Sequence, residues 1–281
     1  MRRLRYDAVS YVVRYGGCFN RLRLAKLMGW EGEYPRLREE LLALQNGDGG
    51  WPWRLEAGNP SGVSDTAKVV ELIASVGVDP SSEPMGRAVA YLLDLQNEDG
   101  GWSESPALEG VIPPQWTWVS TEHSGYQTAD VLNALHECGH TGEGVERGVE
   151  FLRGSQNEEG GWRSDVGPER NPVTDLATTD HIVVALLRWG EPRSSPAIVR
   201  AEEMLLERAG NIDSVINLAA SLSCLRSLGY KPDDWRLTGL VDRLIACQRP
   251  DGGGNWFGEL PSSPAQTVDC LEGLWGSVDM A

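Results

Sequence analysis

The chain has 281 residues, of which 41% are hydrophobic and 23% charged, a balance typical of a globular protein that buries a substantial core. Its formal net charge of −16 argues against general nucleic-acid binding, which needs positive charge facing the phosphates. No apolar run approaches the ~20 residues that span a bilayer. The basic start leads into no signal-peptide segment, and the five scattered cysteines form no CxxC pair. We therefore expect reduced thiols, a cytoplasmic location and no transmembrane segment.

A short glycine-rich phrase recurs along the chain. Its clearest copy is QNEDGGW at 96–102, and related copies are QNGDGGW at 45–51, QNEEGGW at 156–162 and QRPDGGGNW at 248–256. The glutamines at 156 and 248 are 92 residues apart, about two repeat lengths, so one degenerate repeat without the phrase is expected between them.

Helices are predicted before and after each copy. Two helical stretches come first, at 6–15 and 20–28. The first helix of each repeat carries charge on one side and spans 37–44, 85–95, 145–154, 198–209 or 237–247. The second helix is apolar nearly all round and spans 65–76, 127–137, 178–189, 214–228 or 266–275. Because a helix that is apolar on every face must be buried on every face, the second helices form an inner layer and the first helices an outer one.

This pattern predicts an all-α fold, an α/α toroid of about six helical hairpins. We expect one domain over residues 1–281, with an N-terminal hairpin at 1–33 and five repeats at 34–281. The phrase suits the turn between two helices. Gly-Gly supplies unusual backbone angles, the preceding acid accepts turn N–H groups, and Gln bonds orphan groups at a helix end. The phrase is therefore interpreted as a joint between hairpins.

The same residues carry a resemblance to a known superfamily. The QNEDGGW and QNGDGGW phrases look like the QW motifs of triterpene cyclases, and residues 125–135 (GYQTADVLNAL) resemble the SQTAWALLAL helix of those enzymes. PSSPAQT at 261–267 is similar to another copy. Over residues 35–281 the chain thus resembles the squalene–hopene cyclase and prenyltransferase β-subunit superfamily. The resemblance implies a single toroid and action on a polyprenyl chain or polyprenyl diphosphate in a central apolar cavity.

Two catalytic motifs of that superfamily are incomplete here. Class II cyclases protonate their substrate with the middle aspartate of DxDDTA, and the matching stretch is GVSDTA at 62–67, with Gly62 and Ser64 replacing two aspartates. Prenyltransferase β-subunits hold zinc with a DxC pair and a distant His, and Asp65-Thr66-Ala67 lacks the cysteine. The resemblance therefore implies neither the standard acid nor the zinc triad, and any acid must be Asp65 or another carboxyl.

Polar residues at the starts of the inner helices are the candidates for chemistry, because helix N-termini favour anionic groups. The predicted catalytic residues are Asp65, Asp175, Asp180 and His181, with Asp180 and His181 as an acid–base pair. Aromatic faces stabilise cations, so loop aromatics join the predicted substrate contacts. These are Trp53, Trp116, Trp118, His123, Tyr126, Asp130 and Asp269. Asp65 and Asp175 equally suit helix N-caps, and the tryptophans suit loop packing.

The expected function is an isoprenoid-processing enzyme, a cyclase or prenyltransferase type, whose partner is a hydrophobic isoprenoid-type small molecule. No cofactor is expected, except Mg²⁺ for a diphosphate substrate. Two alternatives stay open. One is a non-catalytic toroid that binds a lipid or a protein partner, which the incomplete motifs favour. The other is a polysaccharide-active α/α toroid, which the net charge of −16 disfavours for acidic polysaccharides.

Overall fold

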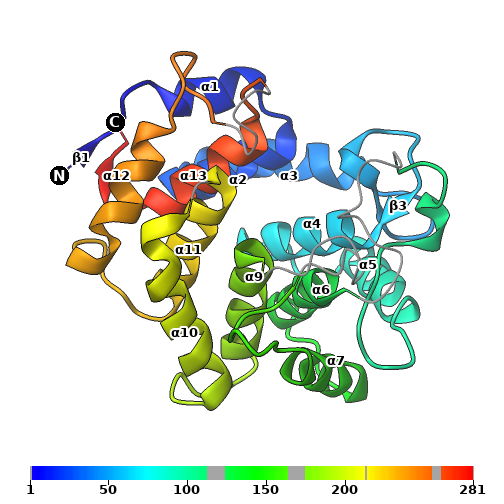
Figure 1. The fold of residues 1–281 in the computed structure, drawn as a ribbon. Helices are drawn as coiled ribbons and strands as arrows, with labels where there is room; N and C mark the ends of the chain where they lie inside the picture. Colours follow the sequence, from blue (N-terminus) through cyan, green and yellow to red (C-terminus); the bar gives the residue numbers. More distant parts are fainter. Residues whose placement is uncertain (1, 113–123, 164–174, 213, 255–260, 281) are drawn as a thin grey trace. The chain divides into compact units, whose positions relative to one another are not determined.

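The computed structural model describes residues 2–112, 124–163, 175–212, 214–254 and 261–280 (Figure 1). Contacts divide the chain into two compact units, Met1–Leu37 with Val199–Ala281, and Arg38–Ile198. Within the described ranges, no helix has the length and apolar character needed to cross a membrane. The extent of the predicted single domain stays a prediction.

Three nearly apolar helices lie side by side in the unit Arg38–Ile198 (Figure 1). They are α4 (Val63–Ser75), α6 (Gly125–Glu137) and α9 (Leu176–Arg188), and α6 packs against both others. Two amphipathic helices, α5 (Glu83–Asp94) and α7 (Glu143–Gly154), pack on this row through their buried faces. Helices α3 (Tyr34–Leu42) and α10 (Pro196–Arg208) each contain a boundary between the two units.

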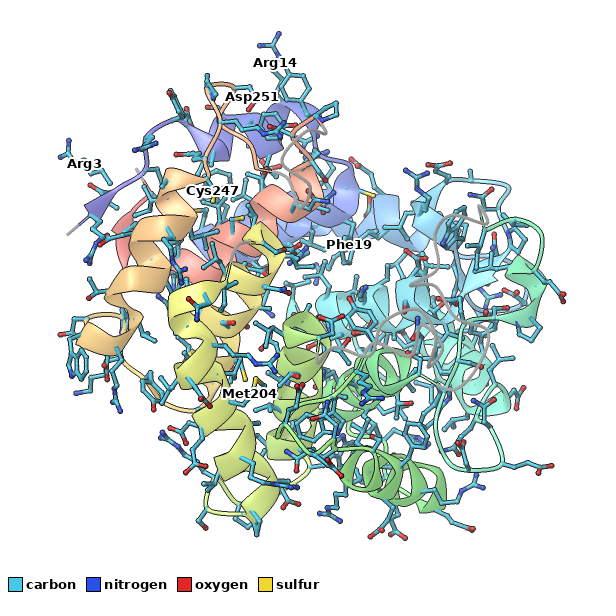
Figure 2. All side chains as sticks on the ribbon, in the orientation of Figure 1. Arg3, Arg14, Phe19, Met204, Cys247 and Asp251 are labelled. Atoms are coloured by element: carbon cyan, nitrogen blue, oxygen red, sulfur yellow. The ribbon has the colours of Figure 1, made fainter. Side chains whose placement is uncertain are left out.

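The unit Met1–Leu37 with Val199–Ala281 is built around α13 (Pro264–Leu274). Helix α13 packs against α1 (Ala8–Tyr15), α2 (Cys18–Met28) and α11 (Val215–Ser227), and α12 (Thr238–Ala246) covers α11. The chain ends meet where β1 (Arg2–Arg3) pairs in parallel with β4 (Val278–Asp279). In Figure 2 the Cys247 side chain lies among the helices of this unit, where it lines a small apolar cavity.

All twelve helices predicted from the sequence are present in the described ranges, with bounds within three residues of those expected. Short elements were not predicted. Strands β2 (Trp51–Pro52) and β3 (Ser61–Gly62) pair in antiparallel fashion across one loop. The described ranges also hold five 3-10 turns, namely η1 (Glu31–Glu33), η2 (Trp53–Leu55), η3 (Pro106–Leu108), η4 (Ala209–Asn211) and η5 (Trp235–Leu237).

The glutamine of each phrase joins two consecutive hairpins. The Nε2 group of Gln96 donates to the carbonyl oxygen of Gly100 and to that of Gly144 in the next outer helix, both at 2.7 Å. Gln45, Gln156 and Gln248 each make the corresponding pair of bonds. Each pair of bonds links the loop of the phrase to the start of another helix, so the prediction that the phrase is a joint between hairpins is confirmed.

The tryptophan and a threonine of the following inner helix complete the joint. The indole of Trp102 donates to the Leu92 carbonyl at 2.7 Å, and its backbone N–H donates to Thr128 Oγ1 at 2.8 Å. Thr128 in turn donates to the Ser124 carbonyl. Thr66, Thr179 and Thr267 accept the corresponding backbone N–H in their repeats. Each joint therefore fixes the start of an inner helix relative to the phrase before it.

Replacing Gln96 with alanine should lower the free energy of unfolding by about 1–3 kcal/mol, because two part-buried backbone carbonyls lose this donor. The control is Glu98→Ala in the same phrase, since Glu98 is exposed and should tolerate truncation within about 0.5 kcal/mol. Urea titration monitored by circular dichroism measures the free energy of unfolding of both variants. Equal stability of the two variants would contradict the role assigned to the glutamine.

Candidate functional site

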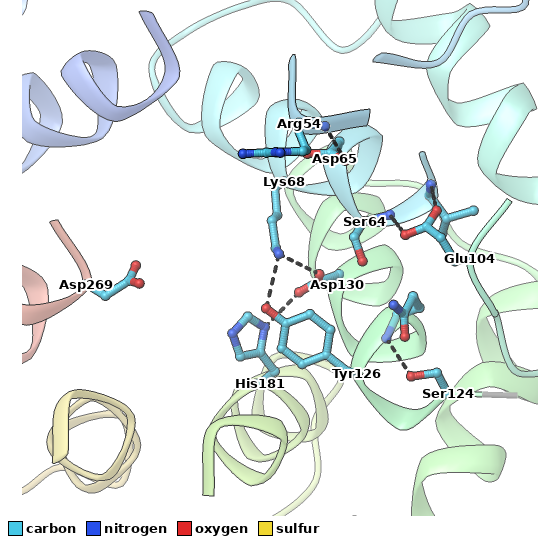
Figure 3. A network of polar contacts seen from close by, with 12 residues as sticks. Arg54, Ser64, Asp65, Lys68, Glu104, Ser124, Tyr126, Asp130, His181 and Asp269 are labelled. Carbon is cyan, nitrogen blue, oxygen red and sulfur yellow. Dashed lines mark hydrogen bonds and ion pairs between the residues drawn. The ribbon is translucent and has the colours of Figure 1, made fainter. Parts of the chain in front are cut away.

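The repeated threonine sets a common register for the inner helices, and three ionisable residues share one position in that register. Lys68, Asp130 and His181 each follow the threonine of α4, α6 or α9 by two residues. Because these three helices lie side by side, residues at the same position come together (Figure 3). We call Lys68, Tyr126, Asp130 and His181 the polar cluster.

Asp130 is the centre of the polar cluster and its side chain is only 2% exposed. Its Oδ1 lies 2.7 Å from His181 Nδ1, and its Oδ2 lies 3.5 Å from Lys68 Nζ. Lys68 also donates to the Tyr126 hydroxyl at 3.0 Å. The rings of Tyr126 and His181 are tilted against each other with centroids 4.5 Å apart. Four side chains from three helices thus form one connected network (Figure 3).

Lys68, Asp130 and His181 hold one another in their charged forms. Burial would raise the pKa of Asp130, but the charges of Lys68 and His181 outweigh it and lower that pKa. Burial would lower the pKa of His181 and of Lys68, and in both cases the Asp130 carboxylate outweighs it and raises the pKa. Burying an unpaired carboxylate costs free energy. Asp130 can therefore stay charged at this buried position because Lys68 and His181 lie beside it.

Two members of the polar cluster are partly exposed to solvent. The side chains of Lys68 and His181 are 35% and 31% exposed. Asp130 engages Nδ1 of His181, and none of the described residues hydrogen-bonds its Nε2. A carboxylate that orients an imidazole while the second nitrogen stays available is an arrangement suited to proton transfer.

Asp65 lies in the first turn of α4, near Lys68 and Asp130 (Figure 3). Its Oδ2 accepts the backbone N–H of Arg54 at 3.2 Å. Arg54 and Leu55 have φ angles of 59° and 56°, a conformation that is costly for residues other than glycine. Burial raises the pKa of Asp65 to about 6, although Lys68 and the Arg54 N–H act in the opposite direction. The carboxyl therefore keeps its proton well above the usual range of an aspartic acid.

Glu104 occupies the place where an N-cap of α4 is expected. It is 2% exposed, accepts the N–H groups of Ser64 at 3.4 Å and Ser105 at 2.9 Å, and also bonds the N–H of Val63. Burial raises the pKa of Glu104 to about 7 against the lowering effect of these N–H groups, and the charge of Asp65 raises it further. The interpretation of Asp65 as the N-cap of α4 is therefore wrong, because the cap comes from the next hairpin.

The other predicted catalytic residues have different surroundings. Asp175 is the N-cap of α9 and accepts the N–H groups of Ala177 and Thr178, so the capping interpretation is confirmed for it. Asp180 is buried in α9, and its negative charge contributes to the raised pKa of His181.

The predicted substrate contacts are spread over the chain. Trp53 is buried in η2, with the Arg54 guanidinium 5.7 Å from its ring centroid. Asp269 belongs to the other compact unit, where it accepts from Arg23 at 2.7 Å. Trp116, Trp118 and His123 lie outside the described residues. Over the described ranges, no group of three or more His, Cys, Asp or Glu side chains is placed to hold a metal ion.

Comparison with known proteins identifies a family that this chain resembles. The family model "Squalene-hopene cyclase C-terminal domain" matches residues 30–167, which include the joints at Gln45 and Gln96 and the whole polar cluster except His181. Over these 138 of its 281 residues the chain resembles the squalene–hopene cyclases. It is 26% identical over 207 residues to a squalene–hopene cyclase of Bradyrhizobium diazoefficiens and 29% identical over 173 residues to a drimenyl diphosphate synthase of Streptomyces showdoensis.

These alignments cover 63% and 60% of the chain but only 29% of each relative, so the chain spans less than a third of their length. Among solved structures, the type II terpene cyclase MstE from Scytonema, in complex with geranylgeranyl dihydroxybenzoate, has a TM-score of 0.72 at 17% identity. That match covers 96% of this chain and 95% of the MstE chain. The ent-copalyl diphosphate synthase of Streptomyces platensis gives 0.62 at 19% identity, over 94% of this chain and 53% of that one. The predicted α/α-toroid fold class is confirmed.

Two residues of the candidate site escaped the sequence analysis. Lys68 stands in an otherwise apolar stretch of α4, and aligning the repeats on their threonines puts it in register with Asp130 and His181. That alignment was the available signal. The sequence holds no comparable signal for Glu104, because its bonds to Val63 and Ser64 join residues about forty positions apart along the chain.

The link between Asp130 and His181 can be measured directly. Replacing Asp130 with asparagine removes the charge that raises the pKa of His181, so this pKa should fall and burial should then dominate. NMR titration of the His181 ring in both proteins reads the change. The control is Glu146→Gln on the exposed face of α7, which should leave the His181 titration unchanged. An unaltered His181 pKa in Asp130→Asn would show that the two side chains are not coupled.

Proposed function

We propose that this chain is an isoprenoid-processing enzyme of the terpene cyclase type, which acts on a polyprenyl chain or polyprenyl diphosphate in an apolar cavity. The observation that carries the proposal is the Asp65 carboxyl. It stands in the register of the superfamily's acid motif, it is only half-buried, and its pKa is raised to about 6. A carboxyl that keeps its proton up to about pH 6 can supply the proton that starts cyclisation.

The proposed first step is protonation of a terminal trisubstituted alkene. The O–H bond of neutral Asp65 breaks as the alkene's π electrons form a C–H bond to the less substituted carbon, which leaves a tertiary carbocation and an aspartate. Lys68 and the N–H of Arg54 stabilise the new carboxylate, since both lower the pKa of Asp65. Neighbouring alkenes then close rings onto the cation, and loss of a proton from carbon ends the reaction. The proton gained and the proton lost balance.

The polar cluster supplies the remaining roles in this proposal. Tyr126 and Asp130 are proposed as substrate contacts, with Lys68 Nζ 4.9 Å from the Tyr126 ring centroid and with Lys68 and His181 both beside the Asp130 carboxylate. His181, oriented by Asp130 through Nδ1, has Nε2 for proton transfer, and Asp180 adds to the charge that keeps His181 protonated. Trp53, Trp116, Trp118 and His123 are proposed as further substrate contacts, whereas Asp269 belongs to the other compact unit and pairs there with Arg23. Asp175 is assigned to capping.

A second candidate function is a non-catalytic toroid that binds a lipid or a protein partner. One observation favours it. Ser64 stands where the superfamily motif has its protonating aspartate, and its buried hydroxyl hydrogen-bonds none of the described residues. A serine hydroxyl is far too weak an acid to protonate an alkene, so the binding function follows if no carboxyl takes over this role.

Incubation of the purified protein with squalene, farnesyl diphosphate, geranylgeranyl diphosphate and geranylgeranyl dihydroxybenzoate, with and without Mg²⁺, tests the proposal by mass spectrometry of the products. We expect a cyclised isomer from at least one of them, and kcat/KM should fall as the pH rises above about 6 because Asp65 loses its proton. Asp65→Asn should reduce turnover by about 100-fold or more.

The control for this experiment is Asp94→Asn, which changes an exposed aspartate at the end of α5 and should leave turnover unchanged. Turnover in Asp65→Asn equal to that of the control would remove Asp65 as the acid. Saturable binding of a probe without any product would favour the second candidate function.

A further inference from the structure

The inner helices α4 and α9 each keep one partly exposed face. From Lys68 to the end of α4, and from His181 to the end of α9, the partly exposed residues recur at intervals of three or four positions. They are Lys68, Glu71, Ala74 and Ser75 on α4, and His181, Val184, Leu187 and Arg188 on α9. Residues three and four apart lie on the same side of a helix, so each set forms one stripe. A ligand that lies against these stripes therefore meets charged side chains.

The charges at the far end of this face are paired with one another. Arg188 donates to Glu71 and to Asn133, and it also pairs with Glu137. Two carboxylates and one guanidinium leave a net negative charge among these four residues, and their only cation is already engaged. This end of the face therefore repels an anion.

The end that carries the polar cluster presents hydrogen-bond donors. Asp130, which is 2% exposed, directs its two oxygens to His181 Nδ1 and Lys68 Nζ. The groups left for a ligand are the His181 Nε2, which bonds none of the described residues, and the Lys68 ammonium, whose three hydrogens exceed its bonds to Tyr126 and Asp130. Both side chains lie on the same side of Asp130 (Figure 3). Two cations and one carboxylate leave one positive charge here.

We propose that Lys68 Nζ and His181 Nε2 together bind an oxyanion, so that the substrate is an isoprenoid with a phosphate or carboxylate head group. The inference rests on the proposed function only for calling this ligand a substrate. An oxyanion accepts charge-assisted hydrogen bonds from both groups at once. A hydrocarbon such as squalene would take both cations out of water without replacing their hydrogen bonds, which costs free energy.

Other charged groups around this pair set the conditions under which an anion binds. Asp130 and Asp180 raise the pKa of His181, whereas Lys68 lowers it. Asp65 lies about one helical turn before Lys68, and its pKa is about 6. The charged groups that act on Asp65 are Lys68, Asp130 and Arg54. Because Asp65 becomes negative as the pH rises above about 6, the affinity for an anion should fall over that range.

Isothermal titration calorimetry of the full chain at about pH 6 compares farnesyl diphosphate, farnesoic acid and farnesol, which share one hydrocarbon chain. At least one of the two anions should bind about tenfold or more tighter than farnesol, and the preferred anion identifies the head group. Lys68→Gln should reduce this preference to below about threefold. The control is Lys231→Gln, the same change at an exposed lysine of the other compact unit, which should leave the preference unchanged.

A measurement on the unaltered protein covers the case in which Lys68→Gln does not fold. Inorganic pyrophosphate, which has no hydrocarbon chain, should raise the pKa of His181 in an NMR titration by about half a pH unit or more, because an anion at Nε2 favours the imidazolium. Sodium chloride at the same ionic strength is the control, and it should raise this pKa less.

Three results would overturn the inference. They are farnesol binding as tightly as both anions, an anion preference that survives in Lys68→Gln, and a His181 pKa that pyrophosphate leaves unchanged. Cyclisation of squalene in preference to both anions would also overturn it and would leave the proposed function standing. Anion binding that depends on Lys68, in a protein that forms no product, would support the inference and count against the proposed function, so the two failures are distinguishable.

Discussion

The bonds between each phrase and its neighbours are the constraint on which the rest of this structure depends. A glutamine amide ties the end of one outer helix to the start of the next, and a tryptophan N–H is held by the threonine of the following inner helix. Burying these backbone groups without partners would be expensive, so each repeat adopts the same register. The glycines of the phrase also help to fix this register. Gly100 has a φ of 91°, and a Cβ there would lie 2.7 Å from the Arg147 carbonyl oxygen.

Because the register is fixed, residues at equivalent positions of neighbouring repeats come together in one site. Because α4, α6 and α9 start from equivalent joints and pack side by side, the residue two positions after the threonine points to the same place in each. In these repeats that position carries a lysine, an aspartate and a histidine, and they neutralise one another in part. Hydrophobic residues at the three positions would pack at lower electrostatic cost. Keeping ionisable groups with perturbed pKa values at one location is typical of functional sites.

The fold was largely predictable from the sequence, because glycine-rich phrases and apolar periodicity report local structure. The helices appear where the periodicity places them, and Asp175 caps α9 as its position before an apolar run suggests. The site was predictable only in part. Asp65, Asp130 and His181 were found from their places at inner-helix starts, but the pairing expected for His181 was with Asp180, whereas its Nδ1 contacts Asp130.

The remaining parts of the site depend on contacts between hairpins, which local patterns do not contain. Residues four apart on one helix can be paired from the sequence, but Asp130 and His181 are 51 positions apart. Glu104 illustrates the same limit, since it caps a helix that begins 41 residues earlier. The capping preference of aspartate therefore led to the wrong residue at α4, where the next hairpin supplies the cap.

Proton-initiated chemistry at the start of α4 is the central claim, and deuterium incorporation tests it most directly. The protein would be equilibrated in D₂O so that the acidic carboxyl carries deuterium, and then given a polyprenyl substrate. Each product molecule should contain one deuterium, located on the carbon that accepts the proton in the first step, with the substrate losing one hydrogen at the end. Product without deuterium would mean that ionisation of another bond starts the reaction, and would contradict the role assigned to Asp65.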